Sequence, residues 1–139
     1  MSFVLDASTT LTWYFEDEVS AAADALMDRM ELEGAVVPPL WRYEVVNGFQ
    51  MAIRRRRIDR AYRDASLAEL RRMPIAIDRG GEDEAWVGAL DLADRFGLTV
   101  YDAAYLELAL RRGLPLATGD DKLTGAARLL AVAVFPSRD

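Results

Sequence analysis

The stretch Phe3-Val4-Leu5-Asp6-Ala7-Ser8, at the start of the chain, indicates the kind of fold. A short apolar run that stops at an acid is typical of a buried strand. Similar short apolar runs recur at residues 35–37, 74–77, 114–118 and 131–135. None of these runs alternates apolar and polar residues, as a strand with one solvated face would. We therefore expect four to five short strands that are buried on both faces.

Helical patterns lie between these runs. The predicted helices cover residues 8–15, 19–30, 40–55, 60–73, 82–96, 103–112 and 122–130. Ser8 or Thr9 is expected to cap the first helix, and Thr99 to Asp102 has the capping-box pattern. Strands that alternate with helices predict a mostly parallel sheet covered by helices on both faces. The predicted fold class is α/β.

The composition is that of an ordinary globular domain. The chain has 139 residues, of which 52% are apolar and 29% charged, and this length predicts a single domain over residues 1–139. It contains no run of 18 apolar residues, and its start lacks the basic segment of a signal peptide. The absence of Cys fits a cytoplasmic protein. We therefore expect a cytoplasmic, single-domain protein with no membrane span.

Missing residue types exclude several kinds of chemistry. The chain contains neither His nor Cys, so it cannot hold a Ser-His-Asp triad, a Cys-His pair or a zinc site rich in those ligands. Its net charge of −6 argues against broad binding of polyanions. A local basic patch or a bound metal ion would reverse the field locally. Catalysis, if present, therefore depends mainly on carboxylates.

Four acids stand where a predicted strand ends or a predicted helix begins: Asp6, Glu44, Asp102 and Asp120. In parallel sheets, ligands bind beyond the carboxyl ends of the strands. The four side chains are therefore expected to meet at one edge of the sheet. Converging carboxylates repel one another unless a cation lies among them. The pattern indicates a hard divalent metal ion held by oxygen ligands.

Each acid also has an ordinary structural explanation. Asp6 can close a turn after a strand. Asp102 is the third helical residue of a capping box, and Asp120 or Asp121 can cap the last helix. Glu44 lies in the first turns of a helix, where the helix dipole favours an acid. From the residues alone, both interpretations of the four acids remain open.

Two polar residues accompany the acids. Ser8 lies two residues after Asp6, so a hydroxyl and a carboxylate share the same strand end. Asn47 follows Glu44 by three residues, which is expected to place its amide one turn above that carboxylate. Both neighbours strengthen the interpretation of a polar site.

Two further stretches have two interpretations each. Arg54 to Arg57, with Arg60 and Arg63, form the one strongly basic stretch. The favoured interpretation is a solvated helix end, and the alternative is contact with phosphates. Trp13, Tyr14 and Phe15 are consecutive aromatic residues, and we expect one of them to be exposed, at a subunit interface or a docking surface.

The chain resembles the PIN-domain family, and within it the VapC-type toxin ribonucleases of type II toxin–antitoxin systems. The most specific similarity is Tyr101-Asp102-Ala103-Ala104-Tyr105-Leu106-Glu107-Leu108-Ala109. The other matching stretches are Val4 to Ser8, Tyr43 to Asn47 and Leu116 to Leu123. The order and spacing of these stretches, and the length of the chain, all agree with the pattern of the family.

The resemblance implies a three-layer α/β/α sandwich and a metal-dependent endoribonuclease that uses Mg²⁺ or Mn²⁺. The positions that match the acidic quartet of the family are Asp6, Glu44, Asp102 and Asp120. The positions that match its supporting polar residues are Ser8, Asn47 and Thr118. The expected partners are an RNA substrate, a VapB-like antitoxin and a second copy in a homodimer. DNA would be bound only through the antitoxin.

Within this hypothesis, Asp6 and Asp102 bind the metal ion directly. Glu44 and Asp120 hold waters or a second ion. Because the chain has no His, a carboxylate or a metal hydroxide acts as the base. The alternatives are a receiver-like signalling domain, a phosphatase of the Asp-x-Asp type, and a PIN-like protein that binds RNA without cleaving it. The receiver would need a phosphoacceptor Asp near the middle of the chain, and the phosphatase an acid where Ser8 stands.

Overall fold

The sheet has five strands that all run in parallel. The computed structural model describes residues 1–136, and residues 137–139, the end of the predicted domain, lie outside the described residues. The strands pair in the order β3-β2-β1-β4-β5. Their bounds are β1 Phe3–Leu5, β2 Ala35–Val37, β3 Ile75–Ile77, β4 Leu116–Ala117 and β5 Val134–Phe135. The predicted parallel α/β architecture is confirmed.

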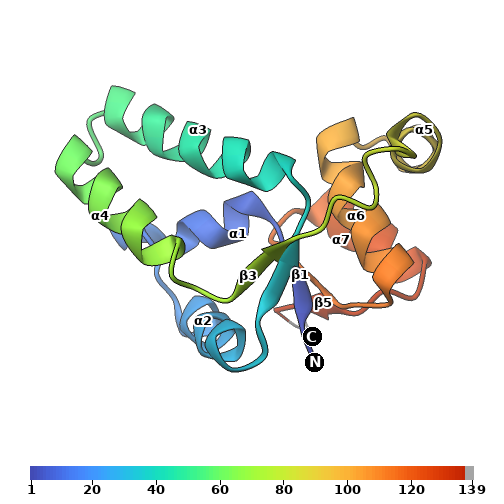
Figure 1. The fold of residues 1–139 in the computed structure, drawn as a ribbon, viewed down its shortest axis with the longest axis horizontal. Helices are drawn as coiled ribbons and strands as arrows, with labels where there is room; N and C mark the ends of the chain where they lie inside the picture. The colour runs from blue at the N-terminus through green and yellow to red at the C-terminus, as the bar shows by residue number, and fades with distance from the viewer. Residues whose placement is uncertain (137–139) are drawn as a thin grey trace.

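Helices cover both faces of the sheet, so the molecule has three layers (Figure 1). The first group is α1 Ala7–Thr12, α2 Ala21–Glu33, α3 Leu40–Arg54 and α4 Arg60–Leu70. The second group is α5 Leu90–Phe96, α6 Val100–Arg112 and α7 Asp121–Leu129. A 3₁₀ turn, η1 Glu16–Glu18, follows α1, and a π-helical segment, η2 Ala85–Ala89, precedes α5. Among the described residues, no helix is both long and apolar enough to cross a membrane.

The core lies around the central strand β1. All three of its side chains are fully buried, as are Leu106 and Leu108 of α6. Burying an aliphatic side chain of this size contributes about 1.5–3 kcal/mol relative to exposure. Strand β1 and helix α6 therefore form a rigid base for the residues at their ends.

The first helix differs from its predicted start and end. The prediction that Ser8 or Thr9 caps it is wrong, because Asp6 is the cap and accepts a hydrogen bond from the Thr9 amide at 2.8 Å. The helix ends at Thr12 rather than at residue 15. A carboxylate directly after the strand reaches the free amides of the first turn, so the helix begins at Ala7, two residues before the start that a Ser8 cap would give.

Several other boundaries also differ from the prediction. The helix predicted over residues 82–96 begins at Ala85, and its first part, η2, is π-helical and runs directly into α5. The last strand begins at Val134 rather than at residue 131, since Ala131 has a φ of 59°, outside the extended region. The helices after β1 and the order of the strands nevertheless follow the predicted alternation.

The prediction of an exposed aromatic side chain among residues 13–15 is wrong. Tyr14 and Phe15 are buried, and both rings pack edge-on against Phe49 of α3. Trp13 is half-buried, and its indole nitrogen donates a hydrogen bond to the Ala23 carbonyl at 2.9 Å. The chain turns after α1, and this turn brings consecutive side chains to different parts of the same interior.

Candidate active site

Asp6 lies at the end of β1 and is 5% exposed. Its amide donates to the Ala117 carbonyl of β4 at 3.2 Å, which fixes the backbone at the carboxyl edge of the sheet. Its Oδ1 accepts hydrogen bonds from the Thr9 amide and, at 3.2 Å, from the Ser8 hydroxyl. These bonds orient the carboxylate and use one of its two oxygens.

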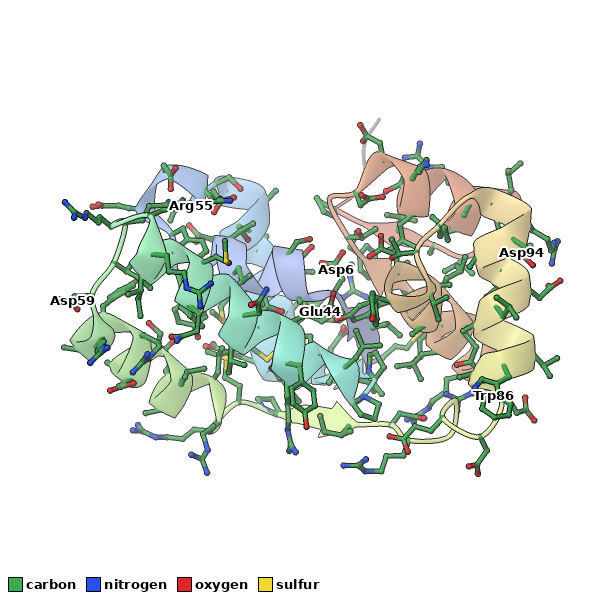
Figure 2. All side chains as sticks on the ribbon, turned by 90° about the horizontal axis from the view of Figure 1, so that it is seen from above. Asp6, Glu44, Arg55, Asp59, Trp86 and Asp94 are labelled. Atoms are coloured by element: carbon green, nitrogen blue, oxygen red, sulfur yellow. The ribbon has the colours of Figure 1, made fainter. Side chains whose placement is uncertain are left out.

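Glu44 lies in the second turn of α3 and is half-buried. Its Oε1 accepts a hydrogen bond of 2.6 Å from the hydroxyl of Tyr105, a residue of α6 that is 1% exposed. Burial raises the pKa of the Glu44 carboxyl, the bond from Tyr105 opposes this shift, and the charges of Asp102 and Asp6 raise the pKa further. Figure 2 shows Asp6 and Glu44 close together between the two groups of helices.

Asp102 and Asp120 begin the two helices on the other side of the sheet. The amide of Asp102 donates to Oγ1 of Thr99 at 3.1 Å, which is the expected helix cap. Asp120 caps α7 by accepting at Oδ1 from the Leu123 amide at 2.8 Å. Burial raises the pKa of Asp102, and the charges of Asp120 and then Asp6 raise it further. Of the neighbouring acids Asp120 and Asp121, Asp120 is the one whose charge acts on Asp102.

The four acids therefore form one electrostatic cluster, which we call the acidic rim: Asp6, Glu44, Asp102 and Asp120. The charges of Asp102 and Asp6 raise the pKa of Glu44, and the charges of Asp120 and Asp6 raise the pKa of Asp102. Within residues 1–136, however, no group of three or more acidic side chains lies close enough to hold a metal ion in this arrangement.

The donor chemistry of the rim fits a hard cation. Asp6, Glu44 and Asp120 each engage one carboxylate oxygen in the hydrogen bonds above. Their second oxygens receive no hydrogen bond from any described residue, and oxygen ligands of this kind suit Mg²⁺ or Mn²⁺. Binding would require small side-chain rotations toward a common point.

Two of the three predicted supporting residues contact the rim. Ser8 donates to Asp6, and Thr118 accepts at Oγ1 from the Asp120 amide at 3.1 Å. Asn47 is exposed and makes no hydrogen bond with Glu44 or any other described residue. The interval of three residues places Asn47 on the solvent side of α3, since Tyr105 approaches Glu44 from the interior.

The sequence prediction missed three residues that support the acidic rim. Tyr105 holds Glu44, and the indole nitrogen of Trp41 donates to Oγ1 of Thr10 at 3.0 Å. Thr10 in turn donates to the Asp6 carbonyl at 2.8 Å. A hydroxyl inside the apolar stretch 103–109 was the available signal for Tyr105, because a buried hydroxyl requires a partner.

With this geometry established, known proteins provide a comparison. The PIN domain model matches residues 3–129, nearly the whole chain. The chain belongs to the PIN domain family. This membership replaces the receiver-like and phosphatase alternatives, and all four acids of the rim lie within the matched region of the PIN domain.

Individual relatives agree with this assignment. Ribonuclease VapC3 of Mycobacterium tuberculosis, found in two strains, is 44% identical over 66 residues, which are 48% of this chain and 45% of the relative. The chain thus spans less than half the length of the curated relatives that it matches. The structure of PAE2754 from Pyrobaculum aerophilum has a TM-score of 0.68 at 24% identity and covers 96% of this chain and 83% of its own. The structure of FitAcB from Neisseria gonorrhoeae has a TM-score of 0.67 at 17% identity. The match covers 97% of this chain and 96% of the FitAcB chain. Both structures share the fold of this PIN domain.

Proposed function

We propose that this chain is a metal-dependent endoribonuclease that hydrolyses RNA phosphodiester bonds at the acidic rim. The observation that carries the proposal is the convergence of four carboxylates at the carboxyl edge of a parallel sheet, where the charges of the neighbouring acids contribute to the raised pKa of Glu44 and of Asp102. Membership of the PIN domain family and similarity to a protein named as a ribonuclease support the same reaction.

The residues of the rim have distinct proposed roles. Asp6 and Asp102 bind Mg²⁺ or Mn²⁺ directly, and Glu44 and Asp120 hold waters or a second ion. The bound ion supplies Lewis-acid polarisation of a phosphate oxygen and an activated water. Tyr105 and Ser8 orient Glu44 and Asp6 through hydrogen bonds, and Thr118 positions the backbone of Asp120. With no His in the chain, a carboxylate of the rim accepts the proton of the attacking water.

The decisive test compares Asp6→Asn with Asp94→Asn in cleavage of labelled RNA with Mn²⁺. Asn is as good a helix cap as Asp, so Asp6→Asn removes the charge and preserves the fold. We expect cleavage to fall by on the order of 10³-fold, which corresponds to the several kcal/mol that a bound metal contributes. Asp94 is exposed on α5, far from the rim (Figure 2), and its variant should keep full activity.

Excess EDTA should abolish the cleavage by the wild type, and added Mn²⁺ should restore it. Full activity of Asp6→Asn, or of the wild type in EDTA, would contradict the proposal. If the wild type bound RNA tightly and left it intact under all metal conditions, the chain would instead be an RNA-binding PIN domain without cleavage activity.

We propose further that the chain acts as the toxin of a toxin–antitoxin pair, as a homodimer that a VapB-like antitoxin inhibits. The similarity to ribonuclease VapC3 supports the role as a toxin. Exposed apolar side chains in η2 and at the start of α5, namely Trp86, Val87 and Leu90, support a subunit interface. Expression in cells should arrest growth, and Trp86→Glu should shift the sedimenting species from dimer to monomer.

A further inference from the structure

The positive charge of this chain is concentrated on one pair of helices. Residues 40–73, which contain the hairpin of α3 and α4, carry nine arginines and four acids, a net charge of +5. The whole chain carries −6, so the remainder has a net charge of −11. In Figure 1 this hairpin projects on the side of the sheet opposite to α5, α6 and α7. One arm of an acidic protein therefore has the charge that attracts polyanions.

The arginines of the hairpin differ from the other cations in their partners. Within residues 1–136, every Lys or Arg outside the hairpin has an interaction partner, as in the pairs Arg29–Glu33 and Arg95–Asp91. On the hairpin, Arg57 pairs with Asp17 and Arg63 with Asp64. The other seven have no partner among the described residues: Arg42, Arg54, Arg55, Arg56, Arg60, Arg71 and Arg72. Their charge is available to a ligand.

Four of these unpaired arginines lie at the far end of α3 from the acidic rim. We call this group the arginine end: Arg54, Arg55, Arg56 and Arg60. Arg54 follows Glu44 by ten residues, which corresponds to about 15 Å along a helix. Figure 2 shows Arg55 at the opposite end of α3 from Glu44 and Asp6. The exposed residues Asn47, Gln50 and Arg54 share one face of α3, so polar side chains lie along the helix between the rim and the arginine end; Gln50 also accepts a hydrogen bond from Arg63 at 2.7 Å.

The backbone at Arg56 gives an independent indication of function. Arg56 has a φ of 59°, in the left-handed region that favours glycine. It follows the end of α3, where the Arg56 amide donates to Ile53 and the Arg57 amide to Ala52, both at 2.9 Å. Glycine is the usual residue at this position of a helix end. Glycine would therefore be more stable at position 56, and the presence of a cation there, beside three other unpaired arginines, is consistent with a ligand contact.

Aromatic surface adjoins the same arginines. Arg56 and Arg60 line an open pocket together with Trp13 and Tyr62. The acids in its lining are Glu16, Asp17 and Asp59, of which Asp17 pairs with Arg57. Tyr62 is exposed, and Trp13 is half-buried. Guanidinium groups beside aromatic faces are the combination that holds single-stranded nucleic acid, through phosphate contacts and base stacking.

We propose that the arginine end binds backbone phosphates of the RNA strand on one side of the scissile bond. The inference rests on the proposed ribonuclease function and adds a second contact region to it. A strand held at the acidic rim through a metal ion runs along α3 and reaches the arginines about 15 Å away, within a few nucleotides. RNA is favoured over an acidic peptide because the same helix connects the arginines to the carboxylates of the site.

The test measures binding of a fluorescein-labelled single-stranded RNA of 12 nucleotides by anisotropy, in an Asp6→Asn background that prevents cleavage. The Arg54→Gln/Arg56→Gln double variant should lose roughly tenfold in affinity at moderate salt. Its slope of log affinity against log salt should become shallower by about 1.4, since each phosphate contact to a single strand contributes about 0.7.

A matched control removes the same charge elsewhere on the hairpin. Arg71 and Arg72 also lack partners but lie about 16 Å from Arg60, at the other end of α4. Arg71→Gln/Arg72→Gln changes the net charge equally and should alter RNA affinity less than about twofold, with the salt slope unchanged. Equal losses in the two double variants would overturn the proposal, because the effect would then come from the overall field.

Arg56→Gly provides a test with opposite signs. Glycine adopts the left-handed conformation without strain, so the melting temperature should rise by about 3 °C, whereas RNA affinity should fall by several-fold. If Arg56 only ends the helix, Arg56→Gly should raise the melting temperature and leave RNA affinity unchanged. That result would also overturn the proposal.

The two proposals fail in different ways. If the wild type cleaves RNA and Arg54→Gln/Arg56→Gln cleaves it with the same KM and kcat, the arginine end is rejected and the ribonuclease remains. If the wild type neither binds nor cleaves RNA, the ribonuclease proposal itself is rejected. Both proposals are supported if Arg54→Gln/Arg56→Gln cleaves RNA with a raised KM and an unchanged kcat.

Discussion

Two groups of carboxylates in this protein have surroundings of opposite charge. In the acidic rim, Glu44 and Asp102 have other acids as their charged neighbours, and burial together with these charges raises the pKa of both. Asp78, after β3, instead faces arginines, and the hydrogen bond from Arg111 is the main cause of its lowered pKa. The ionised form of a carboxyl group is therefore destabilised in the acidic rim and stabilised at Asp78.

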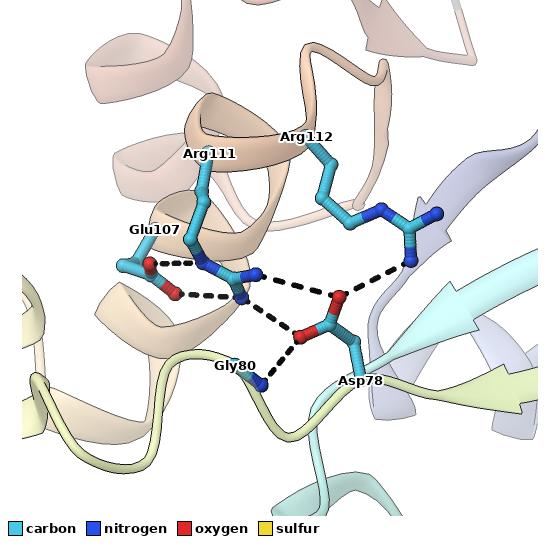
Figure 3. Close-up of polar contacts among 5 residues, drawn as sticks. All are labelled: Asp78, Gly80, Glu107, Arg111 and Arg112. Carbon is cyan, nitrogen blue, oxygen red and sulfur yellow. Dashed lines mark hydrogen bonds and ion pairs between the residues drawn. The ribbon is translucent and has the colours of Figure 1, made fainter.

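The cluster around Asp78 is complete by itself (Figure 3). Its Oδ1 accepts from Arg111 at 2.9 Å and from the Gly80 amide at 2.8 Å, and its Oδ2 accepts from Arg112 at 3.1 Å. Arg111 also donates to Glu107 at 2.7 Å. A side chain at Gly80 would clash with Arg111, because a Cβ there would lie 2.5 Å from its guanidinium. This cluster fastens the segment after β3 to α6.

The difference separates a structural cluster from the proposed active site. The Asp78 cluster has a cation for its carboxylates within the chain, so nothing further is needed to stabilise it. Among residues 1–136, no Lys or Arg pairs with the acidic rim, and an external cation would relieve its repulsion. Uncompensated charge that lowers stability is typical of an active site before its ligand binds.

The largest expected effect is that of Asp102→Asn at the acidic rim. Removing one of the mutually repelling charges should raise the melting temperature of the metal-free protein in EDTA by about 3 °C. The same variant should lose RNA cleavage by on the order of 10³-fold. Differential scanning calorimetry and a cleavage assay measure the two effects.

Addition of Mn²⁺ sharpens this test. Binding to the folded state should raise the melting temperature of the wild type and of Asp94→Asn, and should raise that of Asp102→Asn much less. An equal increase in all three proteins would place the ion outside the acidic rim.

A smaller effect is expected from Tyr105→Phe. The ring still fills its buried position, but Glu44 loses its only hydrogen bond from a described residue. Removing a partner that orients a metal ligand typically lowers metal affinity by 10–100-fold, so we expect about a tenfold weaker Mn²⁺ affinity by calorimetric titration. A lower melting temperature with unchanged Mn²⁺ affinity would show that the hydroxyl acts only in packing.

The smallest effect is expected from Asp78→Asn, which tests the structural cluster. The variant should unfold about 1 kcal/mol more easily at pH 7, a modest value because Arg111 and Arg112 are partly exposed. RNA cleavage should be unchanged, since Asp78 does not contact the acidic rim. A loss of cleavage at unchanged stability would contradict this division of roles.

The pH dependence of the Asp78 contribution has a definite sign. Its pKa is lowered in the folded state, so its stabilisation is present above the unfolded pKa of about 3.9 and is lost as the pH falls through the folded pKa. The difference in stability between the wild type and Asp78→Asn should therefore shrink as the pH falls from 6 to 3, as measured by urea unfolding. A constant difference would show that the charge of Asp78 contributes nothing.

The strands and most helices could be predicted because their signals are local. Short apolar runs and glycines such as Gly97, which ends α5 in the left-handed conformation, are visible in the sequence. The boundaries that failed depended on contacts between elements or on backbone angles. The turn after Thr12 is one such case, because Phe49 of α3 provides the packing surface for Tyr14 and Phe15.

The sequence by itself determined which residues could meet. The alternation of strands and helices assigned Asp6, Glu44, Asp102 and Asp120 to one edge of a parallel sheet, since parallel strands share the direction of their carboxyl ends. The absence of His and Cys determined that carboxylates must carry the chemistry of such a site.

Only the tertiary structure decided which partner each charge has. Tyr105 reaches Glu44 across 61 positions of sequence, and Arg111 reaches Asp78 across 33. The local i, i+4 spacing accounts for the pair of Arg111 with Glu107, but no local pattern shows that Arg111 also pairs with Asp78. The strength and sign of a charge interaction depend on distance and burial in three dimensions, and these are properties of packing between elements that are distant in the sequence.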